Sequence, residues 1–170
     1  MEKGPFWMLG GEEGVLIDYT IPLSQALADA DVVLSEWDTD NDPSAMRDEK
    51  KAHAQLSVEY LLPLHFTSSN TAFDLLKELR KFGRPVTLRE VLGVKACSEV
   101  LRNLLRIEAP VRIDAIPVMG TLQEDGKEVP SIARHQPSGR WGLIPLVAWL
   151  PTILLPSNLL IVVTKEERVG

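Results

Sequence analysis

The clearest hydrophobic pattern in the chain lies in the stretch SSNTAFDLLKELRKFGRPVTLREVL. Its apolar side chains recur at the three- and four-residue spacing of a helix with one buried face; they are Ala72, Leu75, Leu76, Leu79 and Phe82. Asn70 or Thr71 can cap the start of this helix, while Gly83 and then Pro85 end it. The pattern therefore predicts one helix over about residues 70–82.

Most other apolar segments have the length and alternation of β-strands. We expect strands at 6–9, 15–19, 31–37, 55–66 and 111–119. A glycine-containing turn is expected to join the first two. These elements predict an α+β fold, a mostly antiparallel β sandwich or barrel-like domain with one main flanking helix (about 70–82). At 170 residues the chain has the length of a single domain, residues 1–170.

An acidic segment over residues 38–51 interrupts the strand pattern. Its carboxylates fall at the first, third, fifth and twelfth positions of a calcium-binding loop; they are Asp38, Asp40, Asp42 and Glu49. Pro43, however, occupies the sixth position, where such a loop needs a glycine with positive φ. We therefore expect an exposed acidic loop and no metal site.

The C-terminal region 141–163 contains no charged residue. It is long enough to span a membrane, but Pro145, Pro151 and Pro156 would break a helix repeatedly. We therefore expect apolar strands and no membrane contact. Because this region exceeds what a small core needs, part of it, including Trp141 and Trp149, is a candidate subunit interface.

Charge is distributed unevenly along the chain, whose net charge is −6. Residues 1–62 carry 13 acids and 4 bases, and residues 77–112 carry 9 bases and 4 acids. Either these are two ordinary solvated faces, or the acidic face of one subunit meets the basic face of the next. Under the second interpretation Arg80, Lys81 and Arg84 are interface candidates.

Sequence motifs for catalysis or cofactor binding are absent. The three histidines share no ligand spacing, and the single cysteine, Cys97, is expected in the core. No catalytic, cofactor-binding or metal-binding residue is therefore assigned, and no cofactor is expected. A small enzyme without a recognisable motif is the most distant alternative. The start of the chain lacks the apolar core of a signal peptide, which favours a protein made in the cytoplasm.

The chain after Pro85 permits two interpretations. If residues 87–92 and 95–106 are helices, the segment 73–113 resembles a winged helix-turn-helix, with a wing strand at VRID. In that family the third helix enters the major groove of DNA. The resemblance then implies four DNA-contacting residues, which are Lys95, Ser98, Arg102 and Arg106.

If strands follow Pro85, residues 21–118 resemble the distal-tail (Dit-like) and baseplate proteins of tailed bacteriophages. The matching elements are the paired leucines Leu75-Leu76, the segment PVT at 85–87, Ser98-Glu99, and Leu105-Arg106-Ile107 before Pro110. This second resemblance is the one we favour.

The tail-protein resemblance implies a structural viral protein without catalytic residues. Such a protein assembles as a ring-shaped homo-oligomer that connects the tail tube with baseplate proteins. Its partners would be further copies of itself and other tail proteins, with no nucleic acid. It would be made in the bacterial cytoplasm and reside in the virion tail.

Overall fold

The computed structural model describes residues 2–35, 52–64, 72–108, 112–121, 128–134, 138–147 and 159–169. In chain order its elements are β1 (Glu2–Lys3), β2 (Phe6–Asp18), α1 (Leu23–Asp29), β3 (Val32–Ser35), β4 (His53–Pro63), α3 (Ala72–Leu79), β5 (Arg84–Pro85), α4 (Leu88–Cys97), α5 (Glu99–Arg106), β6 (Ala115–Pro117), the 3-10 turn η2 (Met119–Thr121), β7 (Glu128–Arg134), β8 (Trp141–Val147) and β9 (Ile161–Val169).

The strands form two sheets, which confirms the predicted α+β class. Sheet A has the order β1-β2-β4-β9-β5 and is antiparallel, while sheet B has the order β3-β8-β7-β6. Among the described strand pairs of sheet B, only β3–β8 is parallel. The described strands close no barrel. The barrel-like alternative is therefore excluded.

Strand β2 is one continuous strand, where the sequence predicted two strands and a turn. It pairs with β4 from Phe6 to Asp18, with register shifts between Met8 and Gly10 and between Glu12 and Val15. These irregularities are β-bulges, which bend a strand without ending its pairing. The glycine-containing segment is thus accommodated inside the strand.

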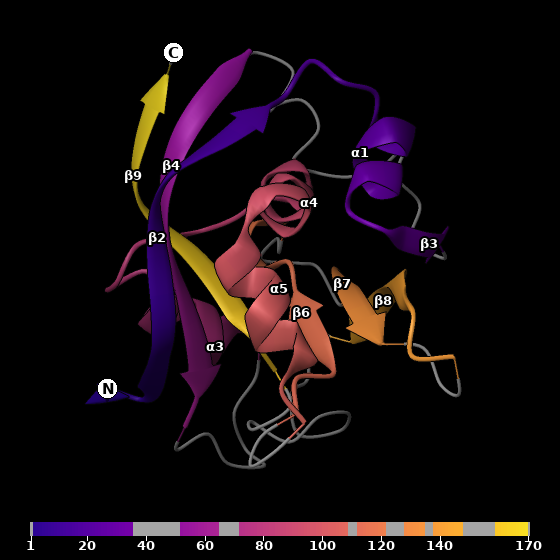
Figure 1. Cartoon of the computed structure of the whole chain (residues 1–170). Coiled ribbons are helices and arrows are strands. Elements are labelled where there is room, and N and C mark those ends of the chain that lie inside the picture. Colours follow the sequence, from indigo (N-terminus) through magenta and orange to yellow (C-terminus); the bar gives the residue numbers. More distant parts are fainter. Residues whose placement is uncertain are drawn as a thin grey trace.

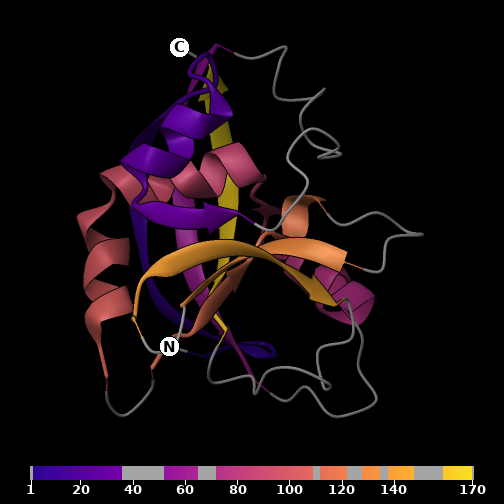
Figure 2. The ribbon, with the colours of Figure 1, turned by 90° about the vertical axis from the view of Figure 1, so that its right-hand side faces the viewer.

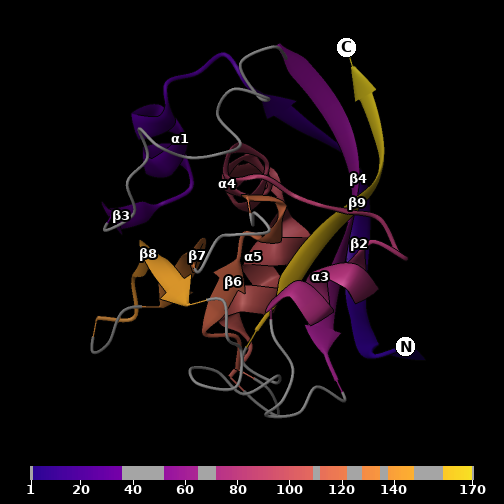
Figure 3. The same ribbon diagram turned by 180° about the vertical axis from the view of Figure 1, so that it is seen from behind.

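Alternate residues of β4 point to two different hydrophobic clusters, because side chains alternate across a strand. Tyr60 and Leu62 pack in the larger cluster with α4 and α5, whereas Leu61 packs with α3 in the smaller one. The helices α4 and α5 therefore cover one face of sheet A, and α3 covers the opposite face. Figures 1 and 3, which view the molecule from opposite sides, show α3 behind and then in front of sheet A.

Helices α4 and α5 lie between sheet A and strands β6, β7 and β8 of sheet B (Figures 1 and 2). Buried side chains from both sheets, among them Leu56 of β4, Leu143 of β8 and Ile132 of β7, contribute to the larger cluster. The two sheets therefore share one core, in which α4 and α5 are the middle layer.

The expectation of one main flanking helix is wrong, because the described residues contain four helices. Helix α3 lies within the predicted range 70–82 and ends at Leu79, three residues before its predicted end. The strand expected from Val86 is also wrong: β5 ends at Pro85, and Thr87 caps α4. Its side chain accepts from the Glu90 backbone while the Glu90 side chain accepts from the Thr87 backbone, a capping box that fixes a helix start.

Two further expectations fall partly or wholly outside the described residues. The acidic segment 38–51 and its calcium-like spacing lie outside them. In the region 141–163, the described residues are β8, the two residues Leu159 and Leu160, and the start of β9, so that strands form most of the described part. No described helix is long and apolar enough to cross a membrane. Cys97, expected in the core, is exposed at the end of α4.

Candidate functional site

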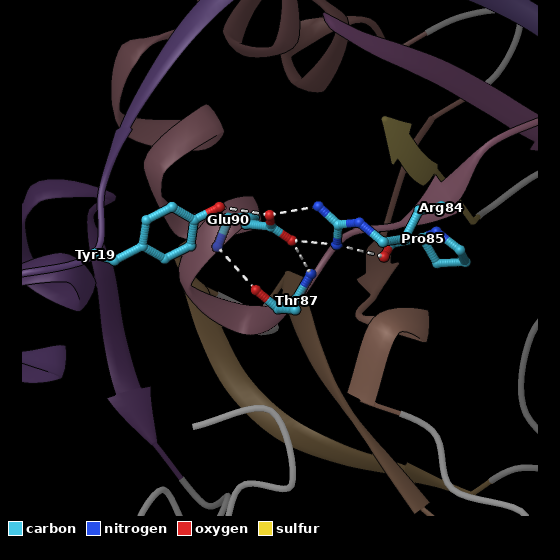
Figure 4. Close-up of polar contacts among 5 residues, drawn as sticks. All are labelled: Tyr19, Arg84, Pro85, Thr87 and Glu90. Atoms are coloured by element: carbon cyan, nitrogen blue, oxygen red, sulfur yellow. Dashed lines mark hydrogen bonds and ion pairs between the residues drawn. The ribbon is translucent and has the colours of Figure 1, made fainter. Parts of the chain in front are cut away.

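The carboxylate of Glu90 is the centre of a buried polar network between β2, β5 and α4 (Figure 4). Both terminal nitrogens of Arg84 donate to it, Nη1 to Oε1 at 2.8 Å and Nη2 to Oε2 at 2.7 Å. The Tyr19 hydroxyl donates to Oε2 at 2.6 Å, and the Thr87 backbone N–H donates to Oε1 at 2.8 Å. The Glu90 side chain is fully buried, so these protein groups take the place of the hydrogen bonds that water would donate to the carboxylate.

The surroundings of Glu90 keep it ionised. Burial by itself raises the pKa of this carboxyl, but the hydrogen bonds and positive charge of Arg84, with Tyr19 and Thr87, outweigh burial and lower the pKa to about 2. A general acid or base needs a pKa near the working pH and access to a substrate. Glu90 has neither, so the network is an element of stability.

A second buried network surrounds Ser98. Its hydroxyl accepts from the Leu101 backbone N–H at 3.0 Å, caps α5, donates to the Glu12 carboxylate and lies 2.9 Å from the Tyr60 hydroxyl. Burial raises the pKa of Tyr60 to about 12, the Ser98 hydrogen bond opposes this rise, and the Glu12 charge adds to it. Ser98, expected to contact DNA, is thus a buried cap.

The other three residues proposed to contact DNA border one hollow, together with Arg134 and Trp141. Arg102 and Arg106 are exposed on α5, while Lys95 is buried and donates to the Ala30 carbonyl. A buried ammonium cannot reach a DNA groove. The structure thus brings these cations together around one open hollow, with Lys95 buried beneath it.

The described residues do not form the winged helix-turn-helix of the alternative interpretation. Helix α3 lies on the opposite face of sheet A from α4 and α5, so the three helices do not form a common bundle. Residues 112–114, expected in the wing strand, are not in a strand; β6 starts at Ala115. The DNA-binding alternative loses its structural basis.

The interface candidates lie apart. Arg80 and Lys81 are exposed beyond the end of α3, and Lys81 pairs with Glu78 at 3.0 Å. Arg84 is committed to Glu90, and Trp141 is buried beneath Arg134, so neither is a free contact surface. Trp149 lies outside the described residues.

The two edges of sheet A are the described feature best suited to binding another protein. Strand β1 pairs with β2 only at Phe6 and Trp7, and β5 pairs with β9 only at Val163 and Thr164. Beyond these two-residue strands, no other described strand borders the outer sides of β2 and β9. Such edges present backbone groups that can pair with an added strand.

The open edge of β2 adjoins an apolar hollow of about 210 Å³ between β2, α1 and α4. Leu16 borders it and is 55 % exposed, the largest exposed fraction among the large apolar side chains described. A strand added to this edge would cover Leu16. The sequence did not indicate this edge, because it was interpreted as two short strands.

Groups of three or more metal-ligating side chains are not found in the parts of the chain that the structure describes. His53 lies 3.4 Å from Asp18 at the pairing of β2 and β4, while His65 and His135 are outside the described residues. The described geometry therefore offers no metal centre on which a catalytic mechanism could be built.

Comparison with known proteins gives no match: no family model, curated protein or solved structure is similar to this chain. What the protein does must therefore be inferred from its own residues and fold.

Proposed function

We propose that the chain is a structural subunit that assembles head to tail with further copies, β9 of one copy extending sheet A at β2 of the next. The observation that carries this proposal is the pair of open edges, one on each side of the same sheet. An added strand satisfies the backbone groups of both edges and covers apolar side chains at the junction.

Charge on β2 favours a contact between unlike edges. Glu12 and Glu13 lie near its open edge, so two β2 strands placed side by side would bring like charges together. The open part of β9 carries the bases Lys165 and Arg168 beside Glu166 and Glu167, so pairing of β2 with β9 offers opposite charges that a pair of β2 strands lacks. A contact between two different surfaces repeats from copy to copy and forms a ring when the rotation closes.

The bacteriophage tail or baseplate is the setting we propose for such a ring, following the resemblance of residues 21–118 to distal-tail proteins. Part of that resemblance required strands after Pro85, where the structure has α4 and α5. The proposal therefore rests on the sheet edges, and the tail setting rests on the remaining sequence similarity. In this function the protein connects other proteins and catalyses no reaction.

Sedimentation velocity of the purified chain over a range of concentrations tests the assembly. We expect species larger than a monomer, and negative-stain electron microscopy should show closed rings. The variant Leu16→Lys places a charge at the β2 edge and should shift the chain to monomers. Because Leu16 is more than half exposed, this change leaves the core filled.

Ile107→Lys is the matched control, because Ile107 is 43 % exposed and follows the end of α5, outside the strands of sheet A. It should assemble as the wild type does. A strictly monomeric wild type at high concentration, or a Leu16→Lys variant that assembles unchanged, would contradict the proposal. Tube, sheath or tape-measure genes beside the coding sequence would support the tail setting, and their absence would count against it.

A further inference from the structure

A hollow of about 440 Å³ opens between the end of α1, helices α4 and α5, and strands β7 and β8. Four of the side chains that border it are cationic; they are Lys95, Arg102, Arg106 and Arg134. They come from the consecutive helices α4 and α5 and from the more distant strand β7. The fold thus concentrates positive charge around one concave surface.

Arg134 and Trp141 form a rigid inner wall of this hollow. The guanidinium carbon of Arg134 lies 4.6 Å from the centre of the Trp141 ring, a cation–π contact. Its Nη2 atom donates to the backbone carbonyls of Leu105 at 2.8 Å and Ile113 at 3.0 Å. Because these contacts hold the guanidinium in place, it can meet a ligand without losing side-chain freedom.

Lys95 is the cation with the most to gain from an anion. Its side chain is buried, and its ammonium donates to the Ala30 carbonyl, but no described carboxylate lies in ion-pair contact with it. Burial lowers the pKa of Lys95, and the nearby charge of Asp31 opposes this change. An ammonium has three N–H donors. An anion in the hollow would therefore supply further hydrogen-bond acceptors to Lys95, besides the Ala30 carbonyl.

Arg102 and Arg106 lie one helical turn apart on the exposed side of α5, where side chains four residues apart are neighbours. Neither forms an ion pair with any other described residue. Two planar guanidinium groups side by side match the oxygens of a phosphate, each able to donate two hydrogen bonds.

Three carboxylates, Asp29, Asp31 and Glu108, also border the hollow, and Asp31 lies 3.6 Å from Arg140. They limit the excess of positive charge, which disfavours a long polyanion and suits a single small one. The volume exceeds that of one phosphate group and lies within the range of pockets that bind small organic molecules.

We propose that this hollow binds the phosphate group of a small organic phosphate, held by Arg102 and Arg106 at the rim and by Lys95 and Arg134 on the inner wall. This function is independent of the assembly through sheet A, because neither open edge contributes a lining residue. The site requires no catalytic step.

Isothermal titration calorimetry of the full chain in a chloride buffer, with inorganic phosphate as the probe, tests the proposal. We expect measurable binding by the wild type. In the double variant Arg102→Gln/Arg106→Gln the dissociation constant should rise about tenfold or more, because each arginine donates charged hydrogen bonds. Both side chains are exposed, so circular dichroism should show an unchanged fold.

The control is Arg80→Gln/Lys81→Gln, which removes the same charge from an exposed position beyond α3. Its affinity for phosphate should remain within about twofold of the wild type, which is a smaller change than the loss of one charged hydrogen bond would cause. Absence of binding by the wild type, or equal weakening in both double variants, would overturn the proposal. Binding of citrate but not phosphate would also overturn it, in favour of a carboxylate ligand.

Discussion

Arg84 and Glu90 form a two-pronged ion pair in which two guanidinium nitrogens meet two carboxylate oxygens at 2.8 and 2.7 Å. The pair joins β5, at the edge of sheet A, to the first turn of α4. Glu90 is fully buried and Arg84 is 34 % exposed. Without the pair, Arg84 could still be solvated by water, whereas the Glu90 carboxylate would lose its main charged partner. The contact fixes the position of α4 relative to the sheet.

Arg84→Ala should lower the free energy of unfolding by about 3 kcal/mol, because it leaves a buried carboxylate without its main partner. Urea unfolding followed by circular dichroism measures this change. Lys81→Ala is the control: its ion pair with Glu78 is exposed at the lysine, and its loss should cost about 0.5 kcal/mol or less. Equal effects of the two substitutions would contradict the role assigned to Arg84.

The same network predicts how stability depends on pH. The pKa of Glu90 is about 2 in the folded protein, below its value in an unfolded chain, so the unfolded state binds the proton first as pH falls. Its stabilising contribution is complete above about pH 5 and is lost as pH falls toward 2, amounting to about 3 kcal/mol over that window.

Glu90→Gln should flatten this acid dependence, and Glu78→Gln, on the exposed side of α3, should retain it. Urea unfolding at a series of pH values between about 2 and 7 separates the two. The hydrogen bonds from Thr20 lower the pKa of Asp18 in the same direction, and this contribution persists in both variants. The prediction fails if Glu90→Gln and the wild type lose stability in parallel.

Two buried serines should respond differently to substitution by alanine. Ser98 caps α5 and contacts Tyr60 and Glu12, so Ser98→Ala should cost about 1–2 kcal/mol. Ser131 is equally buried, but its hydroxyl has no hydrogen-bond partner among the described atoms. Ser131→Ala should therefore change stability by less than about 0.5 kcal/mol, or increase it. Thermal unfolding of the pair compares the two directly, and a larger loss for Ser131→Ala would refute this account.

Local signals in the sequence were sufficient where an element depends on its own residues. Helix α3 follows from the spacing of its leucines, and it appears as predicted. Helix α4 also had a local signal, because Thr87 and Glu90 have the spacing of a capping box. The resemblance to distal-tail proteins instead favours strands after Pro85, and the structure has α4 there.

The polar sites could not be predicted, because their members are distant in the chain. Tyr19 and Glu90 are 71 positions apart, and Glu12 and Ser98 are 86 apart. Only the pairing of β2 with β4 and the packing of α4 on β2 bring them together. Trp141, expected at a surface, is buried because α4 and Arg134 cover it, which no pattern near residue 141 encodes.

Two glycines, one close to a backbone atom and the other close to a side-chain atom, give the last prediction. A Cβ atom added at Gly120 would lie 2.3 Å from the Val86 carbonyl oxygen, a backbone atom that cannot move without disturbing β5. Gly120→Ala should therefore cost about 2–3 kcal/mol. At Gly93, inside α4, the nearest atom is the flexible Cδ1 of Ile17, which can rotate away. Since alanine also favours a helix by about 1 kcal/mol, Gly93→Ala should be close to neutral. Urea unfolding of the two variants measures the difference, and similar costs at both glycines would show that the backbone at Val86 yields as easily as a side chain.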